Sequence, residues 1–146
     1  MATFMKMLNN ISRAQAIYRQ ERICVSDLKK GHYALVLTIC RAPGRSQEEL
    51  AEELCLNKST VARSLAYLEE KGYITRALHP TDKRQFLVHP TEKMKAVYPE
   101  LRQASFEWRV LLSEGISEEE LRVFDSVLGR MEARAREIIE RQEESK

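Results

Sequence analysis

Two short helical segments that follow each other closely, within residues 46–70, constrain the fold of this 146-residue chain most strongly. The first opens with Ser46-Gln47-Glu48-Glu49, a capping box in which the serine and the glutamate satisfy free amide groups at a helix start. The second opens with Asn57, a favoured N-cap residue. Apolar residues at helical spacing form the inner faces, namely Leu50, Leu54, Val61, Leu65 and Leu68. Two short helices joined by a tight turn predict a helix-turn-helix.

The outward face of the second segment is small, polar or basic in its N-terminal half. With Val61 placed at the core, that face and its flank carry Ser59, Thr60, Arg63, Ala66, Tyr67 and Glu70. The acids are confined to the C-terminal end of the segment. This distribution is typical of a recognition helix that enters the DNA major groove, where an arginine can bind guanine through two hydrogen bonds. A solvated amphipathic helix is the alternative interpretation.

A basic hairpin is predicted directly after the second segment. Lys71-Gly72 is a helix-ending sequence, and Tyr73-Ile74-Thr75 and Phe86-Leu87-Val88 read as paired strands. Between them, the predicted loop 76–84 carries four basic or potentially basic residues, which are Arg76, His79, Lys83 and Arg84. A helix-turn-helix followed by such a hairpin predicts a winged helix, whose tip arginine can lie in the narrow, electronegative minor groove.

Charge is distributed unevenly along the chain, although the totals of 24 bases and 22 acids nearly cancel. Residues 57–88 hold six bases against three acids, whereas residues 113–146 hold ten acids against six bases. A basic centre with an acidic tail suggests a polyanion-binding unit carried on a scaffold that has another role.

Three long amphipathic stripes lie outside this centre. They are Phe4, Met7, Ile11, Ala14 and Tyr18; Val97, Leu101, Ala104, Trp108 and Leu111; and Leu121, Phe124, Leu128, Met131, Ala135 and Ile138. A second capping box, Ser117-Glu118-Glu119-Glu120, opens the last of these helices. One small core cannot easily bury all three stripes, so we expect residues 1–27 and 91–146 to form a homodimerisation region around a DNA-binding domain at 28–90. An intramolecular bundle is the alternative.

Several classes of protein are disfavoured by the sequence. The longest apolar run, Tyr33 to Cys40, is much shorter than the ~20 residues of a membrane-spanning helix, and we interpret it as a buried helix. The N-terminus lacks a secretory signal pattern, which predicts a cytoplasmic protein. The three cysteines, without a Cys-x-x-Cys pair, fit neither disulfides nor a zinc site. No Gly-rich phosphate loop is present, so we expect no enzyme, no catalytic residue, no metal and no cofactor.

Four segments resemble the MarR (multiple antibiotic resistance regulator) family of winged-helix transcription regulators. They are Leu50-Ala51-Glu52-Glu53-Leu54, Asn57-Lys58-Ser59-Thr60-Val61, Leu68-Glu69-Glu70-Lys71-Gly72-Tyr73-Ile74 and Asp82-Lys83-Arg84. The resemblance implies a homodimer held by terminal helices, a palindromic operator, and repression relieved by a small phenolic or aromatic acid or by oxidation. It also implies that Arg84 enters the minor groove while Asp82 braces it. His79 and Met94 depart from the family pattern, and we interpret His79 as a solvated loop residue.

These observations predict a mainly helical regulator with a two-stranded wing that binds double-stranded DNA as a homodimer. The expected DNA-binding residues are Asn57, Lys58, Ser59, Thr60, Arg63, Tyr67, Arg76, Asp82, Lys83 and Arg84. The expected ligand-pocket residues are Tyr18, Arg22, Tyr33 and Trp108. Two alternatives stay open: a regulator of the same fold that senses oxidants through Cys24, Cys40 or Cys55, and a winged-helix module that binds protein. We expect Cys24 and Cys40 to be buried structural cysteines.

Overall fold

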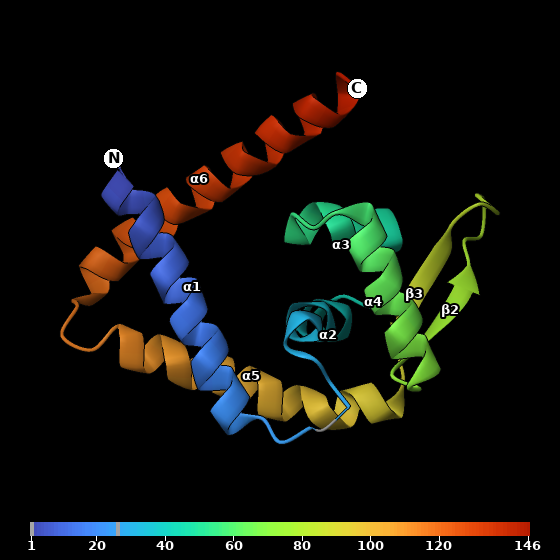
Figure 1. Ribbon diagram of the computed structural model, residues 1–146, viewed down its shortest axis with the longest axis horizontal. Coiled ribbons are helices and arrows are strands. Elements are labelled where there is room, and N and C mark those ends of the chain that lie inside the picture. The colour runs from blue at the N-terminus through green and yellow to red at the C-terminus, as the bar shows by residue number, and fades with distance from the viewer. Residues whose placement is uncertain (1, 26) are drawn as a thin grey trace.

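The computed structural model describes residues 2–25 and 27–146 and is mostly helical (Figure 1). Its helices are α1 (Ala2–Arg22), η1 (Lys30–His32, a 3-10 turn), α2 (Tyr33–Arg41), α3 (Gln47–Leu54), α4 (Lys58–Glu70), α5 (Glu92–Leu112) and α6 (Glu118–Glu144). Its strands are β1 (Arg45–Ser46), β2 (Ile74–Leu78) and β3 (Phe86–Pro90). This order confirms the predicted mainly helical winged helix-turn-helix.

The sheet has one strand more than the predicted two-stranded wing. Its order is β1-β3-β2, with both pairings antiparallel; β2 and β3 are in register from Ile74 opposite Pro90 to Leu78 opposite Phe86. The two residues of β1 are too few to give a periodic pattern, which is why the sequence did not reveal it. Strand β2 also runs on to Leu78, so Arg76 lies within a strand instead of in the predicted loop.

The core lies where α2, α3 and α4 meet the sheet and α5. Four of the five side chains predicted for the inner faces of the helix-turn-helix are fully buried there, namely Leu50, Val61, Leu65 and Leu68, and the fifth, Leu54, is partly buried. The largest fully buried side chains are Tyr73, Leu35, Ile39, Leu50, Leu65, Leu68, Met94 and Leu101. The predicted capping boxes at Ser46 and Ser117 and the N-cap at Asn57 are all present. Gly72 follows the end of α4 with a φ of 77°, a left-handed conformation that glycine adopts without steric cost.

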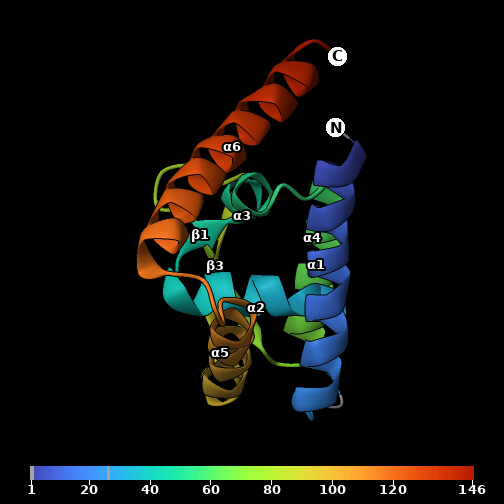
Figure 2. The same ribbon diagram turned by 90° about the vertical axis from the view of Figure 1, so that its left-hand side faces the viewer.

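Helices α1 and α6 extend away from the core. Helix α1 packs against α5, and Figure 2 shows α1 and α6 on opposite sides of the view, both rising from the level of α5. Among the residues of α6, all of which the structure describes, none is buried. The predicted stripes are confirmed as helical, but in the single chain their large apolar side chains are mostly exposed, as for Phe4, Met7, Ile11, Leu111, Phe124, Leu128, Met131 and Ile138.

Over the described residues, the structure contains no helix that combines the length and apolar character needed to cross a membrane. This agrees with the interpretation of Tyr33 to Cys40 as a buried helix, since α2 covers nine residues of which five are buried.

The packing predicts a large difference between two leucine substitutions. Leu65 is completely buried, so Leu65→Ala removes contacts and leaves a cavity, and it should lower the free energy of unfolding by about 2–5 kcal/mol. Leu78 is 58% exposed, and Leu78→Ala should change that free energy by less than about 0.5 kcal/mol. Urea unfolding at one fixed protein concentration checks both values, and equal losses would show that the core is misassigned.

Candidate nucleic-acid interface

The N-terminus of α4 is held in place by its own cap. The Asn57 Oδ1 atom accepts hydrogen bonds from the backbone N–H of Ser59 at 2.8 Å and from the Ser59 hydroxyl at 2.6 Å. The remaining free amide groups at this helix end carry partial positive charge, which favours a phosphate. Asn57 and Ser59 therefore shape the helix end that is predicted to meet DNA.

Most of the predicted recognition residues lie together on the accessible side of α4. Lys58, Ser59 and Arg63 are exposed, and Thr60 is half-buried. Lys58 is 3.9 Å from a Glu48 carboxylate oxygen, but both side chains are more than half exposed, so this ion pair is weak. The first two turns of α4 thus present hydroxyl and basic groups to a ligand.

Tyr67 has a different environment from the other predicted residues of α4. Its side chain is half-buried, its hydroxyl donates to the backbone oxygen of Asp27 at 2.7 Å, and its ring centroid lies 4.8 Å from that of His32. The hydroxyl is therefore engaged within the chain. Direct DNA binding by Tyr67 stays a prediction.

The tip of the wing is organised by Asp82. Its Oδ1 atom accepts a hydrogen bond from the backbone N–H of Arg84 at 3.1 Å, and its Oδ2 atom accepts one from the side-chain amide of Gln85 at 3.3 Å. Lys83 and Arg84 are exposed. Asp82 therefore fixes the backbone that carries these two bases, as the family resemblance implies.

The interpretation of His79 as a solvated residue is wrong. Its ring is half-buried, and Nδ1 accepts from the backbone N–H groups of Thr81 at 3.2 Å and Asp82 at 3.0 Å. His79 is part of the wing turn because it satisfies two backbone donors there.

Arg76 is held against the C-terminal end of α4. Its Nε atom is 2.8 Å from a Glu69 carboxylate oxygen, and only a quarter of its side chain is exposed. Together with Arg84 it lines a small hollow beside the N-terminus of α3. Contact with DNA stays a prediction for Arg76, but its guanidinium already has a partner.

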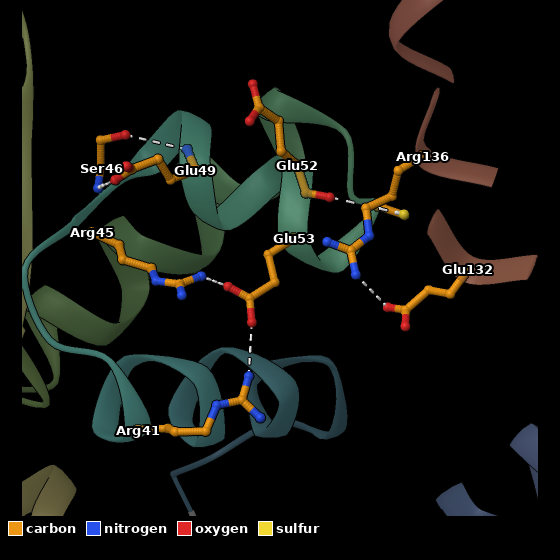
Figure 3. A network of polar contacts seen from close by, with 9 residues as sticks. Arg41, Arg45, Ser46, Glu49, Glu52, Glu53, Glu132 and Arg136 are labelled. Carbon is orange, nitrogen blue, oxygen red and sulfur yellow. Dashed lines mark hydrogen bonds and ion pairs between the residues drawn. The ribbon is translucent and has the colours of Figure 1, made fainter. Parts of the chain in front are cut away.

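A polar network fixes α3, the first helix of the helix-turn-helix (Figure 3). The Glu53 carboxylate lies between Arg41 of α2, at 2.7 Å, and Arg45 of β1. At the other end of α3, Glu49 and Ser46 exchange the two hydrogen bonds of the capping box. Sequence reasoning missed the Glu53 pairs because bases near a Pro-Gly turn carry no signal of their partner.

Three of the four predicted ligand-pocket residues lie together where α1 crosses α5. The Tyr18 hydroxyl donates to Glu107 at 3.2 Å, Arg22 is 3.3 Å from the same carboxylate, and the Tyr18 and Trp108 ring centroids are 5.3 Å apart. Hydrogen bonds from Gln103 and Tyr18 lower the pKa of the Glu107 carboxyl. Tyr33, the fourth residue, is buried in the core.

Four of the hollows on residues 2–25 and 27–146 lie around α3, α6 and the wing, and none of these four is lined by the predicted pocket residues. The largest of the four, of about 500 Å³, lies between α3 and α6. A ligand pocket at Tyr18, Arg22, Tyr33 and Trp108 therefore stays a prediction.

The prediction of buried cysteines is wrong for Cys24, which is exposed, as is Cys55. Cys40 is half-buried, and burial raises the pKa of its thiol. A raised pKa disfavours the thiolate, the form that reacts with oxidants.

Comparison with known proteins agrees with this architecture. Residues 26–85 match the family model described as "MarR family". An HTH-type transcriptional regulator of Bacillus subtilis, YybA, is 34% identical over 105 residues, which cover 72% of this chain and 70% of the relative.

Solved structures agree over most of the chain. The transcriptional regulator SlyA is 30% identical, with a TM-score of 0.85 over 94% of this chain and 96% of that one. A MarR family regulator from Listeria monocytogenes, complexed with 26mer DNA, has the same fold at 23% identity, with a TM-score of 0.85 over 91% of this chain and 89% of that one. The chain belongs to the MarR family of transcriptional regulators, which is a family of regulators and not of enzymes.

Proposed function

We propose that this protein is a homodimeric repressor that binds a pseudo-palindromic operator in double-stranded DNA and is released by a small ligand. The observation that carries the proposal is the pairing of an exposed, basic first half of α4 with an exposed Lys83-Arg84 wing tip. In a winged helix that binds protein, the outer face of the second helix is expected to be apolar or acidic. In this chain the N-terminal half of α4 carries the exposed bases Lys58 and Arg63.

The two basic elements fit different parts of a duplex. Arg63 is exposed on α4, in a position to bind a base edge in the major groove. Arg84 is exposed on a turn that Asp82 fixes, and an arginine on such a projection suits the narrow minor groove. The Listeria regulator of the same fold is solved in complex with DNA, which supports this assignment.

A second copy of the chain is the partner we propose for the apolar sides of α1 and α6. Exposed apolar residues extend from Val123 to Ile139 along α6 and from Phe4 to Ile17 along α1. Rows of exposed apolar side chains along such long helices mark an interface. One twofold pairing covers both copies of these rows at once and places two α4 helices side by side. Residues 1–27 and 91–146 are then the dimerisation region, and residues 28–90 bind DNA.

Ligand control is proposed at the contact of α1 with α5. Tyr18 and Trp108 supply aromatic surface, and Arg22 supplies a cation for the carboxylate of a small aromatic acid. In the structure Arg22 pairs with the Glu107 carboxylate, so the carboxylate of the ligand would compete with Glu107 for Arg22. A ligand that weakens DNA binding about 100-fold needs roughly 2.7 kcal/mol of coupling, which is within the usual range.

A thiol-controlled regulator of the same fold is the second candidate, because Cys24 and Cys55 are exposed. If peroxide acts through them, it should abolish DNA binding by the wild-type protein and spare the variant Cys24→Ser/Cys55→Ser. Unchanged DNA affinity in protein whose free thiols have been consumed would exclude this candidate.

The proposed dimer predicts that Phe124→Glu yields monomers, because the substitution places a charge within the exposed apolar row of α6. Ala133→Glu is the matched control: it adds the same charge to α6 at an exposed residue, and at 100° per residue it faces away from Phe124 and Leu128. Sedimentation equilibrium should give a dimer for the wild type and the control. A monomeric wild type would contradict the proposed assembly.

DNA binding should be strongly dependent on salt. If the dimer neutralises roughly 6–10 phosphates, its affinity should fall by about 10³–10⁵ between 50 and 200 mM salt. Arg84→Ala should weaken binding to an operator selected from random DNA and to an unrelated duplex alike, while Arg122→Ala, which removes the same charge from the start of α6, should change neither. Fluorescence anisotropy measures all of these affinities.

Arg63→Ala should cost about 1–3 kcal/mol on the selected operator and less on the unrelated duplex, because a base contact is lost only where the base is present. Equal losses on the two duplexes would contradict a base-reading role for Arg63.

A further inference from the structure

Asp27 links the C-terminal end of α4 to two other parts of the chain. Its backbone oxygen accepts from the Tyr67 hydroxyl at 2.7 Å, and its carboxylate accepts from the Tyr73 hydroxyl and from Lys93 Nζ, the latter at 2.8 Å. Tyr67 lies on the last turns of α4, Tyr73 directly precedes β2, and Lys93 is in the first turn of α5. We call Asp27, Tyr67, Tyr73 and Lys93 the Asp27 cluster.

Lys93 ties the cluster together a second time. Its Nζ atom also donates to the backbone oxygen of Lys71, at 2.7 Å, and lies 4.3 Å from the centroid of the Tyr73 ring. Lys71 is the C-cap residue of α4. The end of the recognition helix is therefore held through both a side chain and a cap carbonyl, and the two contacts converge on Asp27 and Lys93.

The charges of the cluster are matched at neutral pH. Hydrogen bonds from Lys93 and Tyr73 lower the pKa of the Asp27 carboxyl, so it is ionised. Burial, and then the bond to Asp27, raise the pKa of the Tyr73 hydroxyl, so it stays a donor. Each contact in the cluster has its donor and acceptor in the required form.

The cluster stands where the chain crosses between the proposed regions. Asp27 lies in the connection from α1 to η1, and Lys93 lies just after β3, where the chain enters α5. These are the boundaries of residues 28–90 on both sides. The C-terminal end of α4 is thus attached to the two connections that lead to the dimerisation helices.

From this geometry we infer that the Asp27 cluster fixes the orientation of α4 relative to the dimer, and so determines which half-site spacing the dimer accepts. This inference rests on the proposed function. The members of the Asp27 cluster are then positioning residues that act through α4, and for Tyr67 this role replaces the predicted contact with DNA. One inserted base pair moves a half-site by about 3.4 Å and turns it by about 35°, which a rigidly held helix cannot follow.

Support of the fold alone is the competing explanation, and exposure argues against it. Lys93 is 46% exposed and Asp27 is 32% exposed, and ion pairs with this access to solvent add little to global stability. Their loss should loosen a joint more than it unfolds the domain.

The test uses full-length protein and three duplexes that carry the selected operator with its natural spacing, one base pair fewer or one more. The main variants are Lys93→Gln and Tyr67→Phe. Lys95→Gln is the matched control, because Lys95 is also an exposed lysine in the first turns of α5 but forms its ion pair with Glu92 of the same helix. Thermal unfolding is measured in parallel.

The wild type and Lys95→Gln should prefer the natural spacing by about tenfold or more, which is about 1.4 kcal/mol. Lys93→Gln and Tyr67→Phe should reduce that preference to about threefold or less. A variant in which binding falls equally on all three duplexes would overturn the inference, and so would an unchanged preference.

Two further results separate this inference from the proposed function. Asp27→Asn combined with Lys93→Gln should relax spacing by less than the sum of the two single changes, since both remove the contact between Asp27 and Lys93; fully additive effects would contradict the inference. Wild-type protein that binds no duplex would overturn the proposed function as well, whereas a selective wild type with equally selective variants would overturn the inference alone.

Discussion

The uncovered apolar side of α1 and α6 is the constraint on which the rest of the structure depends. Helix α6 has 27 residues and no buried side chain, and Phe124, Leu128 and Met131 are exposed. As an isolated arm in water such a helix gains no stability from burying its apolar side chains. Most of the buried side chains of the chain lie in the small domain around α2 to α4. The apolar surface of the long helices is therefore available for assembly, and in the dimer that we propose this assembly sets the distance between the two DNA-binding units.

Within the winged helix-turn-helix, the capping residues and the buried side chains favour the same helix boundaries. Caps at Ser46 and Asn57 start α3 and α4, a left-handed Gly72 ends α4, and the buried Leu50, Val61 and Leu65 hold the two helices together. The exposed face of α4 then keeps the residues that packing does not require. The same separation holds in the wing, where Asp82 and His79 build the turn and leave Lys83 and Arg84 in solvent.

Patterns that are local in sequence predicted the fold well, whereas contacts between distant segments could not be predicted. Capping boxes, helical spacing and the Lys71-Gly72 stop gave the helices, because each signal is complete within a few residues. Tyr67 binds a residue 40 positions away and Arg76 pairs with one 7 positions away. The two partners of Glu53 are 12 and 8 positions away, and only the folded chain brings these pairs together. This is why Tyr67 and Arg76 read as free DNA-binding side chains. His79 read as solvated for another reason: its partners, the backbone N–H groups of Thr81 and Asp82, are close in sequence, but only the folded turn directs them at its ring.

In the proposed complex, two copies of residues 57–84 lie side by side on one duplex, each with α4 in a major groove and the tip of the wing in the minor groove next to it. Hydroxyl-radical footprinting of the selected operator tests this most directly. The account predicts protected patches on both strands, related by twofold symmetry, with their centres about one helical turn apart and on one face of the duplex. A single asymmetric patch, or protection that does not repeat with the helical turn, would contradict it.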